Sequence, residues 1–144
     1  MKKASNDTFF CAVADSATLA IGTSAILNFA SCMLHPGETP KVPYVRQCLE
    51  SAPGVIVAAS DYLKVLPGSL DRWMPRKIRS LGTDGFGRSD DRAGLRQFFE
   101  VDARFVAVAT LAELAQEGQI DSNVVAQAIK DFGVDAEKAN PARS

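Results

Sequence analysis

Unbroken apolar runs alternate with turn residues and helical stripes along most of the chain. Residues 55–59 form an apolar run of strand length after Pro53 and Gly54, a pattern typical of a strand covered on both faces. Residues 78–81 have the pattern that ends a buried strand, and a glycine-rich turn follows them directly. The pattern therefore predicts two clear buried strands.

Short helices are predicted on either side of the first strand. Residues 44–51 form a short helical pattern whose apolar side consists of Val45, Cys48 and Leu49. After the strand, Ser60 or Asp61 is expected to cap another helix, which Pro67 and Gly68 interrupt about two turns later. We therefore expect a kinked helix or two half-helices here. The apolar face then resumes at Leu70, Trp73 and Met74.

Two longer helices are predicted in the C-terminal part. Asp102 is expected to cap a helix that runs to about Glu117 and stops at Gly118. Its apolar residues leave almost no polar face, so burial is expected; they are Phe105, Val106, Val108, Ala109, Leu111, Ala112 and Leu114. Asp121 caps the last helix and Gly133 ends it. The apolar stripe of that helix consists of Val124, Val125, Ala128, Ile129 and Phe132.

Strands that alternate with helices predict a three-layer α/β domain with a mainly parallel sheet. Two strands cannot shield their apolar faces alone, so the domain is predicted to be incomplete without further sheet. That sheet has to come from the N-terminal stretch or from a partner. Residues 135–144 are polar, and we expect them to fray.

The turn at residues 82–92 connects the second strand to the next helix. Its three glycines, which allow a sharp reversal, are Gly82, Gly85 and Gly87. Ser89 is expected to cap the helix, with Asp90 and Asp91 in its positively polarised first turn. Gly87 is expected to be indispensable if its φ is positive.

Glycine turns that open a helix can bind phosphate, and this function has to be weighed for residues 82–92. The glycine spacing does not match the dinucleotide fingerprint, and no lysine follows as in a P-loop. Asp90 and Asp91 stand where a phosphate would lie. These observations favour a structural turn.

The composition indicates one ordinary globular domain: 144 residues, of which 47% are hydrophobic and 23% are charged. The formal net charge of -1 gives no reason to expect nucleic acid as a partner. Cys11, Cys32 and Cys48 form neither a CxxC pair nor an even set, which indicates neither a zinc site nor a disulfide framework. A reducing cytoplasm is the expected compartment.

The N-terminal third has no charged residue between Asp15 and His35. A membrane span needs about 20 apolar residues, but serines, threonines and an asparagine dilute this stretch. An export signal is the next possibility, because residues 1–3 are a basic start and residues 30–32 look like a cleavage site. Asp7 and Asp15 interrupt the apolar core that such a signal needs. We therefore expect neither a membrane segment nor export.

Catalytic groups are not evident in the sequence. The single histidine, His35, lies in a proline loop with only Glu38 at ligand spacing, so we expect a surface or hydrogen-bonding role. No Gly-x-Ser-x-Gly motif is present, and the adjacent carboxylates of Asp90 and Asp91 point in different directions on a helix. We predict no catalytic, cofactor-binding or metal-binding residue in this chain.

Arg88, Arg92 and Arg96 recur at every fourth position. Such a stripe could bind an anion or dock a partner. A solvated face with ion pairs, such as one between Arg96 and Glu100, is the favoured interpretation because such exposed pairs are common and weak.

Several motifs, in one order, resemble a known family. Residues 82–90 are followed by Leu95, Phe98, Phe99 and Val101-Asp102, which is similar to the last domain of transketolase-family thiamine-diphosphate enzymes. A narrower likeness is to the C-terminal end of the homodimeric, bacterial-type first component of pyruvate dehydrogenase. It covers about residues 33–141 and adds the motifs at residues 34–36, 39–40, 42–45 and 58–62.

This resemblance implies a transketolase C-terminal-like domain at residues 33–144 and an unmatched stretch at residues 1–32. The latter implies a truncated gene, a shifted reading frame or a mis-set start. In the family, thiamine diphosphate and Mg²⁺ lie between two preceding domains across a dimer interface, and the C-terminal domain supports assembly. The complete enzyme oxidatively decarboxylates pyruvate and transfers acetyl to lipoyl groups. The Gly-Asp-Gly metal-binding segment does not occur here, so no catalytic residue carries over.

We accordingly expect a partial first component, inactive by itself, that associates with itself or with other parts of a pyruvate dehydrogenase complex. The alternative is a stand-alone protein-interaction module without catalysis, and an exported protein is a third possibility. Neither nucleic acid nor a membrane is expected as a partner.

Overall fold

The structure, a computed structural model, describes residues 10–13, 33–39 and 41–143. Three parallel strands form its sheet in the order β1-β2-β3: β1 (Phe10–Val13), β2 (Ile56–Ala59) and β3 (Ile78–Leu81). β2 is central, with Ile56 paired to Phe10 on one side and to Ile78 on the other. Both predicted strands are confirmed, and β1 comes from the N-terminal stretch. The expectation that the N-terminal third holds neither a membrane segment nor an export signal concerns residues that mostly lie outside the described ones.

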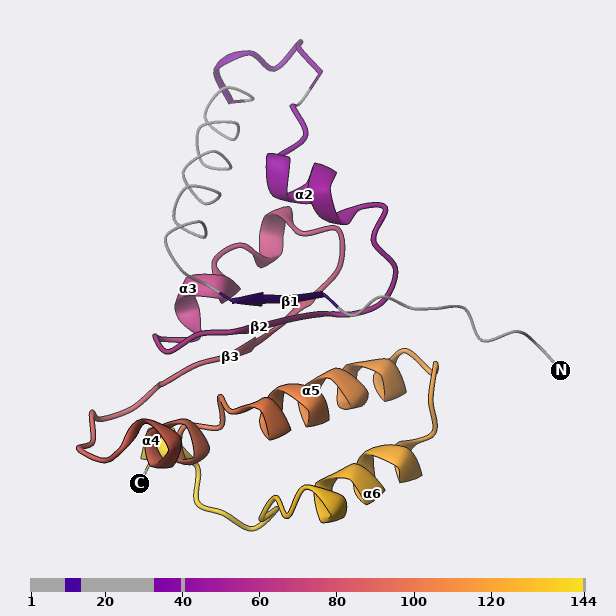
Figure 1. Cartoon of the computed structure of the whole chain (residues 1–144). Helices are drawn as coiled ribbons and strands as arrows, with labels where there is room; N and C mark the ends of the chain where they lie inside the picture. Colours follow the sequence, from indigo (N-terminus) through magenta and orange to yellow (C-terminus); the bar gives the residue numbers. More distant parts are fainter. Residues whose placement is uncertain (1–9, 14–32, 40, 144) are drawn as a thin grey trace, which may run out of the picture.

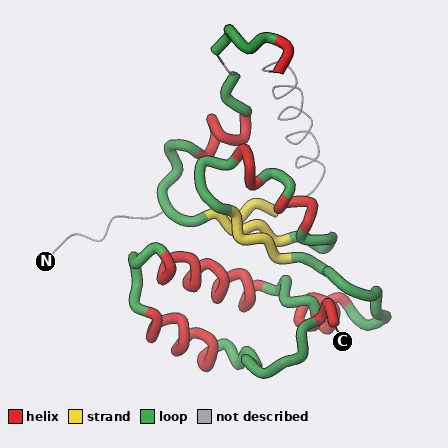
Figure 2. Tube along the Cα trace, turned by 180° about the vertical axis from the view of Figure 1, so that it is seen from behind, coloured by secondary structure: helices red, strands yellow, loops and turns green. Residues whose placement is uncertain are grey.

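Helices lie on both sides of the sheet (Figure 1). The short helices α2 (Tyr44–Leu49) and α3 (Val65–Gly68) lie on one side. The longer helices α5 (Ala103–Gln116) and α6 (Ser122–Asp131) lie on the other (Figure 2). This arrangement confirms the predicted α/β fold with a parallel sheet.

Alternate residues of β2 supply two separate hydrophobic cores, because successive strand side chains point to opposite faces. The first core consists of Val45, Leu49, Ile56, Ala58 and Ile78, with Trp73 and Met74 packed against it. The second consists of Val55, Val57 and Leu114, with Leu81, Val106, Ala109 and Ile120 packed against it. Full burial of a large apolar side chain contributes about 1.5–3 kcal/mol, and β2 is the element that contributes such residues to both cores.

The segment after β2 differs from the prediction. Ser60 does not cap a helix; its hydroxyl oxygen accepts a hydrogen bond from the Tyr62 N–H in a turn. The helix begins later, as α3, and Pro67 lies in its first turn, where a missing N–H costs nothing. A 3₁₀ helix at Asp71–Trp73 follows, so the expectation of two half-helices is confirmed, although the first of them begins later than predicted.

The longer C-terminal helices agree closely with prediction at both ends. The Asp102 carboxylate accepts hydrogen bonds from the backbone N–H groups of Arg104 and Phe105, and Asp121 caps α6 in the same way. Gly118 and Gly133 have φ values of 72° and 61°, as expected of glycines that end helices.

Burial is less complete than the apolar patterns indicate. In α5 only Leu114 is fully buried, because the sheet and α6 cover parts of the helix and leave the other apolar side chains half-exposed. Within α2, Val45 and Leu49 are buried, but the Cys48 side chain is exposed. The expectation that α5 is buried all round is therefore wrong for the chain alone.

The Asp102 cap gives a pH-dependent prediction. Burial acts to raise the pKa of Asp102, but the hydrogen bonds from Arg104 and Phe105 and the Arg104 charge outweigh it and lower the pKa below its ordinary value of 3.8. A lowered folded-state pKa means that the cap stabilises fully above the unfolded value and is lost as pH falls through the folded value. Asp102→Ala should reduce the free energy of unfolding by about 1 kcal/mol at neutral pH.

Urea denaturation at a series of pH values measures this effect, with Glu50→Ala as an exposed control. The difference between wild type and Asp102→Ala should shrink between about pH 5 and pH 2. A difference that stays constant over that range would show that the carboxylate charge does not contribute to the cap.

Candidate functional site: a pocket at the carboxyl ends of two strands

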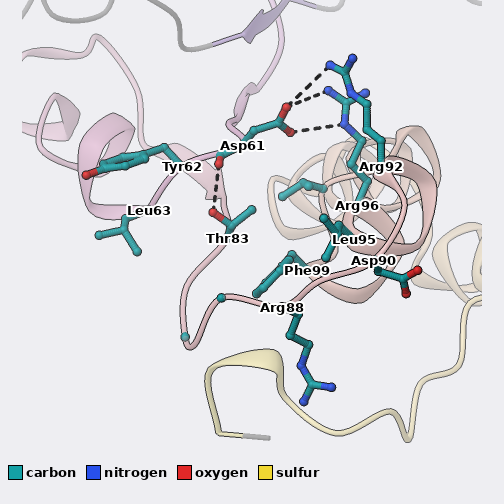
Figure 3. Close-up of a pocket in the computed structure, with 13 residues that line it drawn as sticks. Asp61, Tyr62, Leu63, Thr83, Arg88, Asp90, Arg92, Leu95, Arg96 and Phe99 are labelled. Atoms are coloured by element: carbon teal, nitrogen blue, oxygen red, sulfur yellow. Dashed lines mark hydrogen bonds and ion pairs between the residues drawn. The ribbon is translucent and has the colours of Figure 1, made fainter.

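A pocket of about 660 Å³ lies beyond the carboxyl ends of β2 and β3. The segment after β2 forms one wall through Asp61, Tyr62 and Leu63. The glycine turn after β3 and the helix α4 (Arg92–Phe98) form the rest (Figure 3). Open α/β sheets commonly bind ligands at the carboxyl ends of their parallel strands, so this is the candidate functional site.

The two loops that follow β2 and β3 touch at Gly82. A Cβ atom at Gly82 would lie 2.5 Å from the Tyr62 carbonyl oxygen and 2.7 Å from the Lys64 nitrogen, so no side chain fits. The next residue, Thr83, donates its backbone N–H to the Tyr62 carbonyl at 2.9 Å. The requirement for glycine at the start of the turn is therefore one of space.

Two further residues of the turn hold these loops together. The Asp84 carboxylate accepts a hydrogen bond from the Lys64 backbone N–H at 2.9 Å and lies 3.8 Å from the Lys64 ammonium. The Thr83 hydroxyl donates to the Asp61 carbonyl oxygen at 3.1 Å. The rim of the pocket is thus fixed by contacts between residues about twenty positions apart.

The other glycines of the turn behave differently from one another. Gly85 has a φ of 107°, and a Cβ atom there would lie 2.7 Å from the Pro141 carbonyl oxygen. Gly87 has no positive φ, and a Cβ atom there would meet nothing within 4 Å. The condition for an indispensable Gly87 is therefore not met, and the constrained glycines are Gly82 and Gly85.

The helix α4 begins later than predicted. Asp91 is its N-cap and accepts a hydrogen bond from the Gly94 N–H at 2.6 Å, so Ser89 is not the cap and neither aspartate lies inside the first turn. The Asp90 carboxylate accepts from the Asp91 N–H at 2.8 Å. Asp caps a helix as well as Ser does. The lack of a side chain at Gly94 leaves room for both carboxylates, because a Cβ atom there would lie 2.8 Å from an Asp90 carboxylate oxygen.

Arginines and one aspartate form an ionic cluster at the edge of the pocket. Asp61 accepts hydrogen bonds from Arg96 at 2.9 and 3.3 Å, and Arg92 lies 3.9 Å from the same carboxylate (Figure 3). The hydrogen bond from Arg96 to Asp61, together with the charge of Asp61, raises the pKa of Arg96. Arg88 precedes α4 and lies over the Phe98 ring at 4.1 Å.

The predicted pair of Arg96 and Glu100 is therefore wrong. Arg96 pairs with Asp61, 35 positions away, and Glu100 lies 3.5 Å from the Lys138 ammonium. Helix spacing permits the predicted pair, but the loop after β2 places a carboxylate within reach of two arginines. The arginine stripe thus borders the pocket.

The C-terminal residues pack against α4, which contradicts the expectation that they fray (Figures 1 and 2). Lys138 donates to the carbonyl oxygens of Gln97 and Phe98, at the end of the helix where cations are favoured. Pro141 is buried beside Gly85, at the start of a short 3₁₀ helix. The C-terminal segment therefore packs against the glycine turn at Gly85 and against the end of α4.

Comparison with known proteins identifies the family. A family model described as the transketolase-like TK C-terminal domain matches residues 20–102. The chain belongs to this family. The family resemblance seen in the sequence is thus confirmed, and the residues that line the pocket all lie within the matched range.

Curated relatives named "Pyruvate dehydrogenase E1 component" match most of the chain. The Escherichia coli (strain K12) protein is 54% identical over 110 residues, which are 76% of this chain and 12% of that protein. The Pseudomonas aeruginosa protein is 50% identical over 109 residues, with 75% and 12% covered. A Buchnera aphidicola (subsp. Schizaphis graminum) relative is 39% identical over 142 residues, 95% of this chain and 16% of that protein. The chain thus spans about an eighth of the length of the first two relatives.

The single histidine, His35, lies outside the pocket and contacts one exposed carboxylate. His35 lies 4.0 Å from Glu38, and both side chains are exposed. Among the described residues, no group of three His, Cys, Asp or Glu side chains could hold a metal ion. In that same part of the chain, none of the helices has the length and apolar character needed to cross a bilayer.

The sequence reading did not identify Asp61, Thr83 and Phe99 as parts of one site. Asp61 comes directly after the first predicted strand and Thr83 after the second, apart from one glycine. Because the carboxyl ends of parallel strands meet at one sheet edge, this placement was the available signal. No sequence signal marked Phe99 as a pocket residue, since an aromatic residue in a helical pattern is ordinarily a core residue.

Gly82 and Gly87 form a matched pair for mutation. Gly82→Ala should lower the free energy of unfolding by at least about 2 kcal/mol, because the added methyl group forces two backbone segments apart. Gly87→Ala should change it by less than about 1 kcal/mol, because the site is open. Urea denaturation of both variants measures this, and equal midpoints would show that the contact at Gly82 is not tight.

Proposed function

We propose that the chain is a C-terminal piece of a pyruvate dehydrogenase first component and supplies a structural, assembly-supporting domain. The complete enzyme would oxidatively decarboxylate pyruvate and transfer acetyl to lipoyl groups. The observation that carries this proposal is 54% identity over 110 residues to a protein of that name. At that identity, the buried residues and the glycine turn of the two proteins are expected to be equivalent.

The described residues do not fit the Mg²⁺ and thiamine diphosphate of such an enzyme. Mg²⁺ is held by oxygen ligands, typically carboxylates and phosphates in octahedral geometry. The described residues contain no suitable cluster of metal-ligating side chains, and Asp61 at the pocket edge is already paired with Arg96. We derive no catalytic step for this chain, and propose that the complete enzyme holds these cofactors in its other domains.

The outer helical face provides a surface for assembly. Val124 and Phe132 of the α6 stripe are 47% and 39% exposed, and most of α5 is only half-buried. Apolar surface of this kind marks interaction sites or aggregation-prone faces. We propose that other domains of a cytoplasmic, homodimeric enzyme cover it, and that the isolated chain self-associates there. A stand-alone interaction module would use the same face and is the alternative function.

A chimera tests the proposed function. The aligned segment of the Escherichia coli protein is replaced by the matching segment of this chain, and pyruvate-dependent activity and dimer formation are measured. We expect the chimera to form dimers and to retain activity within about tenfold of the parent, since 54% of the aligned residues are unchanged.

The control chimera carries Gly82→Val, which the pocket rim cannot accommodate, and should lose soluble dimer. A wild-type chimera that folds as a dimer but lacks activity would contradict the proposal. It would favour a separate interaction module.

The isolated chain should not bind thiamine diphosphate in the presence of Mg²⁺, because its described residues offer no metal–diphosphate site. Calorimetric titration measures this directly, with the Escherichia coli relative as the positive control. Saturable, Mg²⁺-dependent binding at about micromolar concentration would overturn the assignment of these cofactors to the other domains.

A further inference from the structure

The pocket at the carboxyl ends of β2 and β3 has two unlike surfaces. One surface is apolar: it consists of Leu95 in α4 and Phe99, the C-cap of that helix. Leu63 lines the pocket from the loop after β2. Arg92 and Arg96 lie along the upper edge, on the same side of α4 as Asp61 (Figure 3). A volume of about 660 Å³ is typical of pockets that bind small organic molecules.

Charge along the lining favours an anion. Three arginines line the pocket, at positions 88, 92 and 96, against two aspartates, at positions 61 and 90. One unit of positive charge is therefore in excess. The two carboxylates are also engaged: Asp61 accepts two hydrogen bonds from Arg96, and Asp90 accepts one from the Asp91 N–H.

The hydrogen-bonding groups of Arg92 are more available than those of Arg96, and the Arg88 guanidinium lies over the Phe98 ring. The Arg92 side chain is 79% exposed, and its distance of 3.9 Å to Asp61 exceeds that of a hydrogen bond. Arg96 by contrast is held at both Nε and Nη2 by Asp61. A guanidinium presents its N–H groups as a planar fork that matches a carboxylate or a phosphate, so Arg92 can bind either in bidentate fashion.

We propose that this pocket binds a small organic anion whose carboxylate or phosphate pairs with Arg92 and whose apolar body packs on Leu95 and Phe99. Asp61 holds Arg96 in place beside the anion and keeps the pocket edge ordered. The glycine turn forms the opposite wall. This proposal concerns a site apart from pyruvate chemistry and does not depend on the proposed function.

Titration of the full 144-residue chain with simple probes tests this site. Phenyl phosphate and phenylacetate carry the two possible anionic groups on the same ring, and benzyl alcohol is the uncharged control. Binding is followed by the backbone amide shifts of the ¹⁵N-labelled chain. Both anions should cause saturable shifts centred on Thr83 and α4, and the tighter of the two indicates whether the natural ligand is a phosphate or a carboxylate.

Benzyl alcohol should bind at least about tenfold more weakly, because it lacks the charge-assisted hydrogen bonds. Absence of saturation by either anion up to about 10 mM would overturn the proposal. Equal binding of benzyl alcohol would also overturn it, since the arginine would then have no role.

Variants assign the binding to Arg92. Arg92→Gln should weaken binding of the tighter probe about tenfold, and Arg92→Lys should restore part of it by keeping the charge. Arg46→Gln, an exposed change of the same charge on α2, should leave binding unchanged. Equal loss in the variants at positions 46 and 92, with both chains folded by circular dichroism, would contradict the assigned contact.

Discussion

The close approach of two loop backbones at Gly82 is the constraint on which the pocket depends. The loop after β2 and the turn after β3 meet there without room for a Cβ atom. That contact aligns the Thr83 N–H with the Tyr62 carbonyl and places Asp84 against Lys64. Asp61 is thereby held where it meets the arginines of α4, so an arrangement of side chains from three segments follows from one backbone contact.

The parts of the fold that could be predicted are those set by neighbouring residues. The apolar run of β2 and the end of β3 were evident from local pattern alone. The caps at Asp102 and Asp121 and the stops at Gly118 and Gly133 depend on hydrogen bonds and φ values within one turn of the chain.

The parts that could not be predicted depend on contacts between distant segments. Arg96 has a suitable partner at Glu100 by helix spacing, yet the fold brings Asp61 closer. The start of α4 could not be fixed because Ser89, Asp90 and Asp91 are all good caps, and the required span of the turn decides among them. Gly87 and Gly82 look alike in sequence, and only the packing of the Tyr62 loop distinguishes them.

Lys138 connects the C-terminal segment to the end of α4, the helix that follows the glycine turn. Its contact with Gln97 spans 41 positions and closes a loop that contains α5 and α6, at an entropic cost that grows only slowly with loop length. During synthesis, the C-terminal end of α4 and the turn at Gly85 remain without their cover until Lys138 and Pro141 have been made. A translation product that stops after α6 would therefore contain every strand and long helix of the described residues and still lack the contacts that cover Gly85 and the end of α4.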